Sequence, residues 1–210
     1  MPKRILMLLT VMTVMLVVAS GVAWAVTKIG TNGPDTLVGT NKADNLLGKG
    51  GDDRIFGLGG RDNLLGGSGK DFILGGTERL ASGGDKILVG GPGNDAVGGG
   101  LGSDNVVGKE GNDFLIGGPG LEPREAPNDK LSGGDGNDVF LVDNVPAAKD
   151  LVTCGDGFDR VLADKKDVVA PNCERVRIVH GSREEVLQQE EEFLASVPRS
   201  FCRGLLFDPC

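Results

Sequence analysis

Apolar side chains recur along the middle of this chain at an interval of nine residues. Each stands two positions after an aspartate, and each aspartate follows a glycine-rich stretch. Alternate residues of an extended segment face opposite sides, so one inward residue between two glycine turns predicts a strand of about three residues per repeat. The inward column predicted in this way is Leu37, Leu46, Ile55, Leu64, Ile73, Ile87, Val97, Val106, Leu115, Leu131 and Phe140.

The aspartates keep the same period wherever the chain has no insertion. The wider spacings predict insertions at 78–82 and 121–127, and one extra residue near Val89. The aspartates of the eleven units between residues 30 and 141 are Asp35, Asp44, Asp53, Asp62, Asp71, Asp85, Asp95, Asp104, Asp113, Asp129 and Asp138, and Asp159 holds the same place in a twelfth unit, residues 154–162.

Nine residues are too few for a pair of helices and do not match the seven-residue period of coiled coils. Two units of turn and strand instead close one coil of 18 residues, and stacked coils give two narrow parallel sheets. Units of equal parity then lie above one another, so the expected neighbours of Asp71 are Asp53 and Asp95. The sequence therefore predicts an all-β fold over residues 26–141, a parallel β-roll with two nonapeptides per coil.

This stacking brings the aspartates into two rows, one along each edge of the roll. Carboxylates about 4.8 Å apart repel each other unless a cation lies between them. Ca²⁺ takes about six to eight oxygen ligands, and glycines allow a loop to turn its carbonyls inward. Ca²⁺ is therefore the expected cofactor. Its candidate ligands are Asp53, Asp62, Asp71, Asp85, Asp95, Asp104, Asp113, Asp129 and Asp138, the loop glycines Gly67, Gly69, Gly91, Gly93, Gly100, Gly102, Gly118, Gly120, Gly134 and Gly136, and more weakly Asp35, Asp44 and Asp159.

A second interpretation of the loops needs no metal. Glycine loops can close as hydrogen-bonded turns in which the aspartate only caps the turn. This alternative is strongest in the first two units, GTNGPDTLV and GTNKADNLL, which lack the second glycine. Lys49 and Leu58 also stand where a second glycine is expected, and Arg61, Lys70 and Lys86 place cations beside candidate ligands.

Several units resemble a known repeat closely. The stretches GGDGNDVFL, GGPGNDAVG, GGLGSDNVV and GGSGKDFIL are similar to the RTX, or hemolysin-type, calcium-binding nonapeptide GGxGxDxUx, in which U is a large aliphatic residue. The resemblance covers roughly residues 30–141. It implies a right-handed parallel β-roll (a β-solenoid) that holds calcium between its loops, in a secreted bacterial protein.

The N-terminus reads as a secretory signal peptide over residues 1–25. Lys3 and Arg4 precede an apolar run, and Ala23-Trp24-Ala25 has the small-x-small form of a cleavage site, with cleavage after Ala25. The alternative is an uncleaved membrane anchor. In either case the remainder of the chain is expected outside the cytoplasm, and the first interpretation predicts a secreted protein.

Residues after the repeats are expected to close the roll. Residues 142–180 keep apolar pieces without the strict period, which predicts a C-terminal cap, pinned by a Cys154–Cys173 disulfide. Residues 182–197 predict an amphipathic helix that begins with a Ser182/Glu185 capping box and ends before Pro198. Its apolar side is expected to contain Val186, Leu187, Phe193, Leu194 and Val197, and the tail within 181–210 to be closed by a Cys202–Cys210 pair.

The ninth position of the repeat is also mostly apolar. Because it follows the inward residue directly, it should lie on the outer face of its strand. The sequence leaves open whether this row binds a partner, associates with itself or is covered by the C-terminal segment. The row comprises Val38, Leu47, Phe56, Leu65, Leu74, Val107, Ile116 and Leu141.

Charge and motifs narrow the possible functions. The chain has 22 basic and 30 acidic residues, and this acidic balance argues against a nucleic-acid partner. The sequence has no GxSxG, HExxH or CxxC motif and one histidine, His180, and GGSGK lacks the Ser or Thr of a P-loop. A non-catalytic calcium-binding protein without a small-molecule substrate is therefore expected. The alternatives are a calcium-dependent adhesion or matrix protein and, less favoured, a small secreted toxin or hydrolase.

Overall fold

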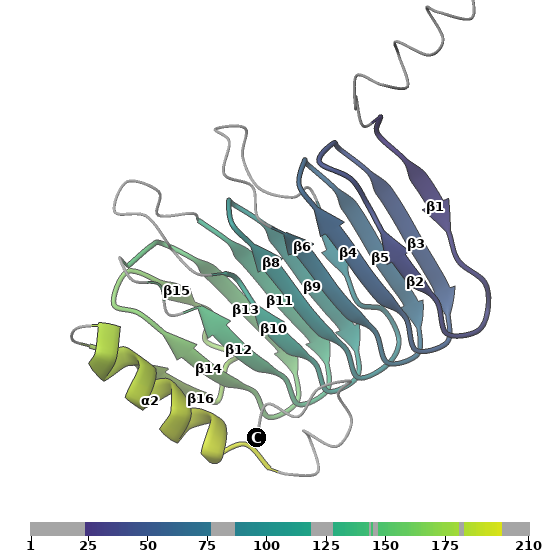
Figure 1. Ribbon diagram of the computed structural model, residues 1–210. Helices are drawn as coiled ribbons and strands as arrows, with labels where there is room; N and C mark the ends of the chain where they lie inside the picture. The colour runs from purple at the N-terminus through teal and green to yellow at the C-terminus, as the bar shows by residue number, and fades with distance from the viewer. Residues whose placement is uncertain are drawn as a thin grey trace, which may run out of the picture.

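The computed structural model describes residues 24–76, 87–118, 128–142, 144, 147–180 and 183–198. These residues form sixteen short strands and one helix, arranged as two parallel sheets that lie face to face (Figure 1). The odd-numbered strands form one sheet and the even-numbered strands the other, so the chain alternates between the sheets at every turn. This is the predicted β-roll.

The first sheet contains the odd strands in chain order. They are β1 (Thr27–Ile29), β3 (Asn45–Gly50), β5 (Asn63–Ser68), β7 (Ile87–Val89), β9 (Asn105–Glu110), β11 (Lys130–Asp135), β13 (Leu151–Asp156) and β15 (Val168–Val169). The second sheet contains β2 (Thr36–Val38), β4 (Arg54–Leu58), β6 (Phe72–Gly76), β8 (Ala96–Gly100), β10 (Phe114–Ile116), β12 (Val139–Val142), β14 (Arg160–Ala163) and β16 (Arg175–Ile178).

The register of the strands confirms the predicted stacking of units with equal parity. Leu46 pairs with Leu64 across β3 and β5, and Ile55 pairs with Ile73 across β4 and β6. Each inward residue therefore lies directly above its equivalent one coil away. The buried column between the sheets is the main hydrophobic core, and it contains the predicted residues with a single exception.

The exception lies in β7. Leu88 is fully buried and pairs with Leu64 and Val106, whereas Ile87 is 42% exposed on the outer face. The prediction of Ile87 as the inward residue was wrong. Leu88 and Val97 are nine residues apart, so the extra residue precedes β7 rather than lying near Val89. Three consecutive aliphatic residues fit either register, and the pairing with β5 and β9 selects one of them.

The sheets continue past the last predicted repeat. Strands β13 to β16 extend both sheets in parallel register, and the disulfide Cys154–Cys173 is confirmed, with its Cα atoms 5.3 Å apart. The Cys202–Cys210 pair lies outside the described residues. So does the predicted signal peptide up to residue 23. Among the described residues, no helix is long and apolar enough to cross a membrane.

Helix α2 (Arg183–Ala195) confirms the predicted helix and covers the outer face of the second sheet near β16 (Figure 1). Val186, Phe193 and Val197 are buried in a second cluster with residues of β10, β12 and β14, and Leu194 packs against this cluster. Leu187, by contrast, is 50% exposed, so its placement on the apolar side was wrong. Ser182 of the expected capping box lies outside the described residues.

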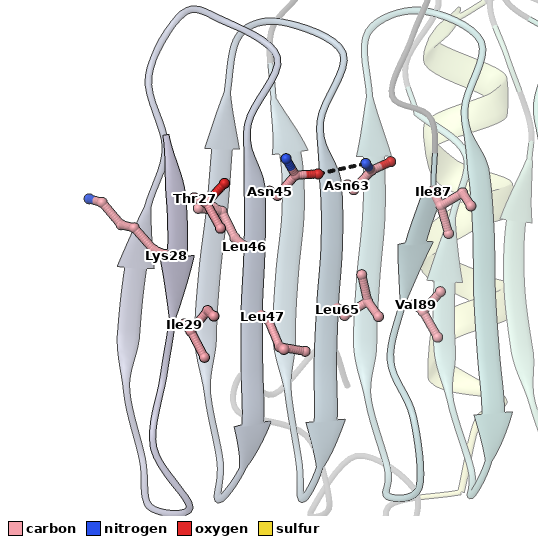
Figure 2. Close-up of a pocket in the computed structure, with 10 residues that line it drawn as sticks. All are labelled: Thr27, Lys28, Ile29, Asn45, Leu46, Leu47, Asn63, Leu65, Ile87 and Val89. Atoms are coloured by element: carbon pink, nitrogen blue, oxygen red, sulfur yellow. Dashed lines mark hydrogen bonds between the residues drawn. The ribbon is translucent and has the colours of Figure 1, made fainter. Parts of the chain in front are cut away.

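The row of ninth-position side chains has two environments. Leu141 is buried in the cluster under α2, and Ile116 packs against that cluster. Toward the N-terminus the row stays partly exposed on both sheets, as at Val38, Leu65 and Leu74. Figure 2 shows the exposed part on the first sheet, where Ile29, Leu47, Leu65 and Val89 follow one another from strand to strand along a shallow groove.

Candidate metal-binding loops

Loops with a left-handed backbone connect the strands at both edges of the roll. We number each loop so that position one is the first residue of the motif GGxGxD and position six is the aspartate. The candidate glycines that the structure describes all have positive φ, as expected for glycine; they are Gly67, Gly69, Gly91, Gly93, Gly100, Gly102, Gly118, Gly134 and Gly136. Lys49 and Leu58 adopt the same conformation at position two, so these departures from the motif do not change the loop.

The position-six aspartates form a continuous hydrogen-bonded ladder. The backbone N–H of Asp71 donates to Asp95 Oδ1 at 2.8 Å, and the N–H of Asp53 donates to Asp71 Oδ1 at 2.9 Å. The same contact links every coil of this edge, through Asp35, Asp53, Asp71, Asp95, Asp113, Asp138 and Asp159. On the other edge it links Asp44 to Asp62 and runs through Asp104, Asp129 and Asp150. One carboxylate oxygen of each inner ladder residue is thus committed to the backbone.

The second carboxylate oxygen is buried without a hydrogen-bond partner in most of these loops. Burying a polar group without a partner is costly, and a buried charge without one is more so. The Oδ2 atoms that are buried without a partner among the described residues include those of Asp53, Asp71, Asp95, Asp113, Asp129, Asp138 and Asp159. A row of unpartnered anionic oxygens is the donor type that a hard divalent cation prefers.

The Oδ2 atom of the aspartate points toward the glycine at position one of its own loop, into the space that a side chain there would fill. A methyl group on Gly48 would collide with Asp53 Oδ2 and with the carbonyl oxygen of Gly66 in the next coil. The same pair of oxygens faces Gly133, where they are Asp138 Oδ2 and the carbonyl of Cys154. Carboxylate and carbonyl oxygens therefore converge on one space at these coil interfaces.

Burial changes the protonation of the ladder. Loss of solvent raises the pKa of Asp95, Asp113 and Asp129 to about 8, and the charges of neighbouring ladder carboxylates raise it further. The same causes raise the pKa of Asp138 to about 7 and that of Asp71 to about 6. The backbone N–H that each carboxylate accepts acts in the opposite direction but does not outweigh burial. Without a counterion, Asp95, Asp113 and Asp129 hold protons that ordinary aspartates have lost at neutral pH, whereas Asp71 is largely ionised there.

The first two loops differ from the others. Thr31 stands at position two and donates its backbone N–H and its hydroxyl to Asp35 Oδ2, at 2.6 and 2.9 Å. Thr40 gives both contacts to Asp44 Oδ2. These hydrogen bonds lower the pKa of Asp35, in contrast to the inner aspartates. The capped-turn interpretation therefore describes these two loops, whose threonines replace the second glycine.

Protein donors also occupy the carboxylate oxygens at the C-terminal end of the edge that carries Asp44 and Asp62. Asn144 Nδ2 donates to Asp150 Oδ2 at 2.6 Å. Asp167 accepts the N–H groups of Asp150 and Asp164 through its two oxygens, at 2.9 and 2.7 Å. On the other edge Glu174 Oε2 accepts the N–H of Asp159 at 2.8 Å. Among the described residues, the second oxygens of Asp35, Asp44 and Asp150 thus have protein donors, whereas that of Asp159 does not.

Sequence reasoning missed Asp150, Asp167 and Glu174 as ladder residues. Each has an apolar residue two positions later, Val152, Val169 and Val176, which was the available signal. The glycine pattern before Asp150, Asp167 and Glu174 is absent, so the period alone did not reveal them.

A second ladder at position five was also missed. Asn112 donates its N–H to Asn94 Oδ1 at 2.9 Å, and Asn137 donates to Asn112 Oδ1 at 2.8 Å. Phe158 continues it by donating to Asn137 Oδ1. Here the later coil donates to the earlier one, the reverse of the aspartate ladder. The two ladders together fix the spacing between loops.

Two predicted site residues, Asp85 and Gly120, lie outside the described residues. The register of β7 bears on the first of them. Leu88 is the inward residue, and the residue two positions before it is Lys86, whereas Asp85 is one position too early. Asp85 therefore does not have the sequence offset of a ladder aspartate.

The donor set fits calcium better than a softer metal. In the part of the chain that the structure describes, no group of three or more His, Cys, Asp or Glu side chains gathers at one point. A cation between two coils would accordingly be held by one or two carboxylates and completed by backbone carbonyls. Oxygen-only coordination of this kind suits Ca²⁺.

Comparison with known proteins gives one match. The family model for the RTX calcium-binding nonapeptide repeat matches residues 29–64, 47–78, 80–106, 98–120 and 128–144, which together make up just over half of the chain. No curated protein and no solved structure matches the chain.

Proposed function

The chain belongs to the RTX calcium-binding nonapeptide repeat family, and from that premise we propose that it is a secreted, non-catalytic protein whose fold depends on calcium bound between its stacked loops. The observation that supports this most is the row of buried Oδ2 atoms without partners. Bound calcium supplies the positive charge that this row lacks. The proposal therefore assigns the ladder a binding role rather than only a turn-capping one.

The residues proposed to hold calcium are those of the inner coils. On one edge these are Asp53, Asp71, Asp95, Asp113, Asp138 and Asp159, and on the other Asp62, Asp104 and Asp129, all of them buried, with loop carbonyls completing the coordination. Asp35, Asp44, Asp150 and Asp167 have oxygens already occupied by protein donors. We therefore exclude these four from the proposed set.

Secretion would bring the chain to an environment in which calcium is abundant. Extracellular calcium modules bind in the range of about 0.1–1 mM, so a chain of this kind folds where calcium is abundant. The apolar N-terminus with its small-x-small site supports export by a Sec-type signal peptide, with cleavage after Ala25. Calcium binding and folding would then occur together outside the cytoplasm.

Circular dichroism of the purified chain tests the proposal. We expect a strong β signal in saturating calcium and a largely unfolded spectrum after chelation, with magnesium unable to replace calcium. An unchanged β signal in chelator would count against calcium-driven folding.

A second candidate function rests on the exposed ninth-position row. Leu65 is 40% exposed and Ile29 59% exposed, and they lie on one face with Leu47 and Val89 (Figure 2). A regular apolar row of this kind suits calcium-dependent self-association or adhesion to a surface. Light scattering with and without calcium tests it: Leu65→Lys should abolish any calcium-dependent increase in mass, and the matched change Leu187→Lys on α2 should not.

A further inference from the structure

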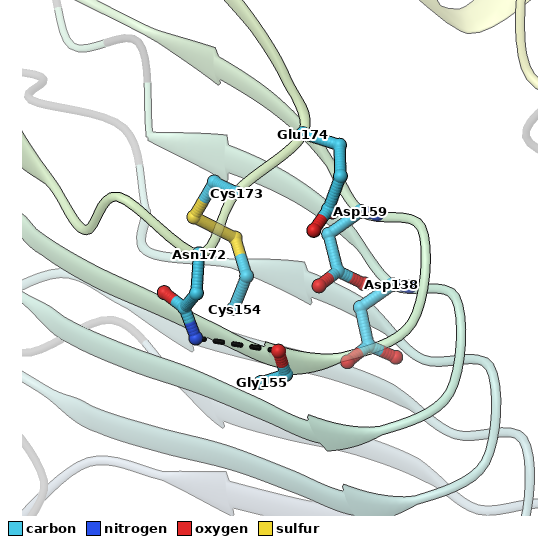
Figure 3. Close-up of a disulfide and its surroundings, with 7 residues drawn as sticks. All are labelled: Asp138, Cys154, Gly155, Asp159, Asn172, Cys173 and Glu174. Carbon is cyan, nitrogen blue, oxygen red and sulfur yellow. Dashed lines mark hydrogen bonds between the residues drawn. A yellow bond between two sulfur atoms is a disulfide. The ribbon is translucent and has the colours of Figure 1, made fainter.

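The loop at residues 154–159, on the edge that carries Asp53 to Asp159, is closed differently from the earlier loops that the structure describes. Three consecutive residues, which we call the clamp (residues 172–174), each hold one part of this loop (Figure 3). Cys173 is bonded to Cys154 at position one, and Asn172 Nδ2 donates to the carbonyl of Gly155 at 3.3 Å. Glu174 accepts the N–H of Asp159. The clamp thus occupies the side on which another coil would stack.

Beneath the clamp lies an interface with the features of the inner cation-binding coils. Asp138 donates its N–H to Asp159 Oδ1 at 2.8 Å, and the Oδ2 atoms of both residues are fully buried without a partner. Gly155 and Gly157 have positive φ, as do Gly134 and Gly136 one coil earlier. The loop at 154–159 lies beyond the residues that the family model matches.

Cys154 links the clamp to the interface between Asp138 and Asp159. It stands at position one, where the other loops named above have glycine, and its carbonyl oxygen faces Asp138 Oδ2 across Gly133. Its sulfur forms the disulfide. The same residue therefore contributes an oxygen to the candidate cation interface and the covalent bond that holds the clamp over it.

Resting on the calcium-binding function proposed above, we propose that the Cys154–Cys173 disulfide is a redox-sensitive lock on this terminal calcium interface. Asn172 and Glu174 are exposed, so without the disulfide the clamp itself is held by two hydrogen bonds from side chains at the surface, next to the backbone pairing of β16 with β14 that begins at Arg175. Reduction releases the clamp, loosens the 154–159 loop and weakens calcium binding at Asp138 and Asp159.

The chemistry of opening is a thiol–disulfide exchange with a dithiol. Cys154 is fully buried and Cys173 is partly exposed, so a reductant thiolate attacks the sulfur of Cys173 and Cys154 leaves as a thiolate. The second thiol of the reductant then displaces Cys173. The protein disulfide becomes two thiols, and the dithiol is oxidised to its own disulfide.

The test compares oxidised and dithiol-reduced protein in a Cys202→Ser/Cys210→Ser background, where Cys154 and Cys173 are the remaining cysteines. A disulfide that closes a loop of this length changes the folding constant on the order of a hundredfold. If several calcium ions bind cooperatively, the change in the folding constant is divided among them. We therefore predict a calcium midpoint roughly threefold higher in the reduced protein. The midpoint is measured by circular dichroism, and Cys173→Ser should reproduce the shift without reductant.

A local readout distinguishes a lock from general destabilisation. In saturating calcium, reduction should accelerate amide hydrogen exchange at Asp138 by about tenfold or more, and leave exchange at Asp53, on the far coils, unchanged. Equal midpoints in the two redox states, or equal acceleration at Asp53 and Asp138, overturns the proposal. If neither redox state responds to calcium, the calcium-binding function itself fails, which is a separate result.

Discussion

At the scale of single residues, loops such as that of Gly48 depend on a glycine at position one because an aspartate oxygen and a carbonyl occupy the place of its side chain, whereas the loop at 154–159 has Cys154 there. The requirement is steric rather than conformational at Gly48, whose φ is not in the left-handed region. The left-handed glycines at positions two and four have a different role, since Lys49 and Leu58 can replace them at position two. The repeat therefore uses glycine for two separate physical reasons.

Alanine substitution at position one tests the steric role. Gly48→Ala places a methyl group against Asp53 Oδ2 and the Gly66 carbonyl, so we expect a loss of about 2–3 kcal/mol in the free energy of unfolding in saturating calcium. Gly33→Ala is the matched control, because its methyl group would meet only Thr31 Oγ1, at 3.9 Å. Urea denaturation measures both. A Gly48→Ala variant as stable as Gly33→Ala would show that the loop has room for a methyl group at position one.

At the scale of strands and helices, the nine-residue period was sufficient to predict the strands, their parallel stacking and the inward column from Leu37 to Phe140. It could not determine the register of β7, because Ile87, Leu88 and Val89 are all aliphatic and the length of the preceding insertion is not encoded in the repeat. It also missed the ladder positions Asp150, Asp167 and Glu174, which lack the preceding glycines. The threonine caps at Thr31 and Thr40 required side-chain geometry that spacing alone does not contain.

The register of β7 gives a prediction at this scale. Leu88→Ala empties a fully buried site and should lower the free energy of unfolding by about 2–5 kcal/mol. Ile87→Ala removes a side chain that is 42% exposed and should cost less than about 1 kcal/mol. Denaturation of both variants in calcium compares them. The reverse order of stability would place Ile87 in the core and reject the register.

At the scale of the whole molecule, the roll is a stack of like charges closed at three of its four ends by protein donors. Thr31, Thr40 and Asn144 donate hydrogen bonds to the terminal carboxylates, whereas the clamp closes the fourth end with its disulfide and leaves Asp159 Oδ2 without a partner. Among the described residues, Asp53, Asp71, Asp95, Asp113, Asp129 and Asp138 have no such donor for the second oxygen. The stability of the folded roll therefore depends on protons or cations that bind to the carboxylates of the inner coils.

This arrangement predicts an unusual dependence on pH in the absence of calcium. The folded-state pKa of Asp95, Asp113 and Asp129 is about 8, well above the ordinary value of 3.8, so the folded chain binds more protons than the unfolded chain between these limits. The free energy of unfolding should consequently fall as the pH rises from about 4 to about 8. Denaturation in chelator across this range measures it.

Calcium should offset this loss of stability at higher pH, because protons and calcium ions compete for the same carboxylates. The apparent calcium affinity is expected to rise with pH through the interval from about 6 to about 8, as the ladder loses its protons. Calcium titrations at several pH values test this part. A calcium midpoint independent of pH over that interval would show that the buried carboxylates do not take part.

The most direct test of calcium binding by the ladder is a comparison of Asp95→Asn with Asp52→Asn, with the free energy of unfolding measured in chelator and in saturating calcium. Asp95 is fully buried with an unpartnered Oδ2, and Asp52 is exposed at position five, where it accepts the N–H of Lys70. The amide introduced by Asp95→Asn keeps an oxygen for the N–H of Asp71 and removes the buried charge that Asp95 carries above its pKa of about 8. We predict that above this pH Asp95→Asn stabilises the calcium-free protein and loses much of the stabilisation by calcium, while Asp52→Asn changes neither. Equal stabilisation by calcium in Asp95→Asn and the unsubstituted chain would contradict calcium binding by the ladder.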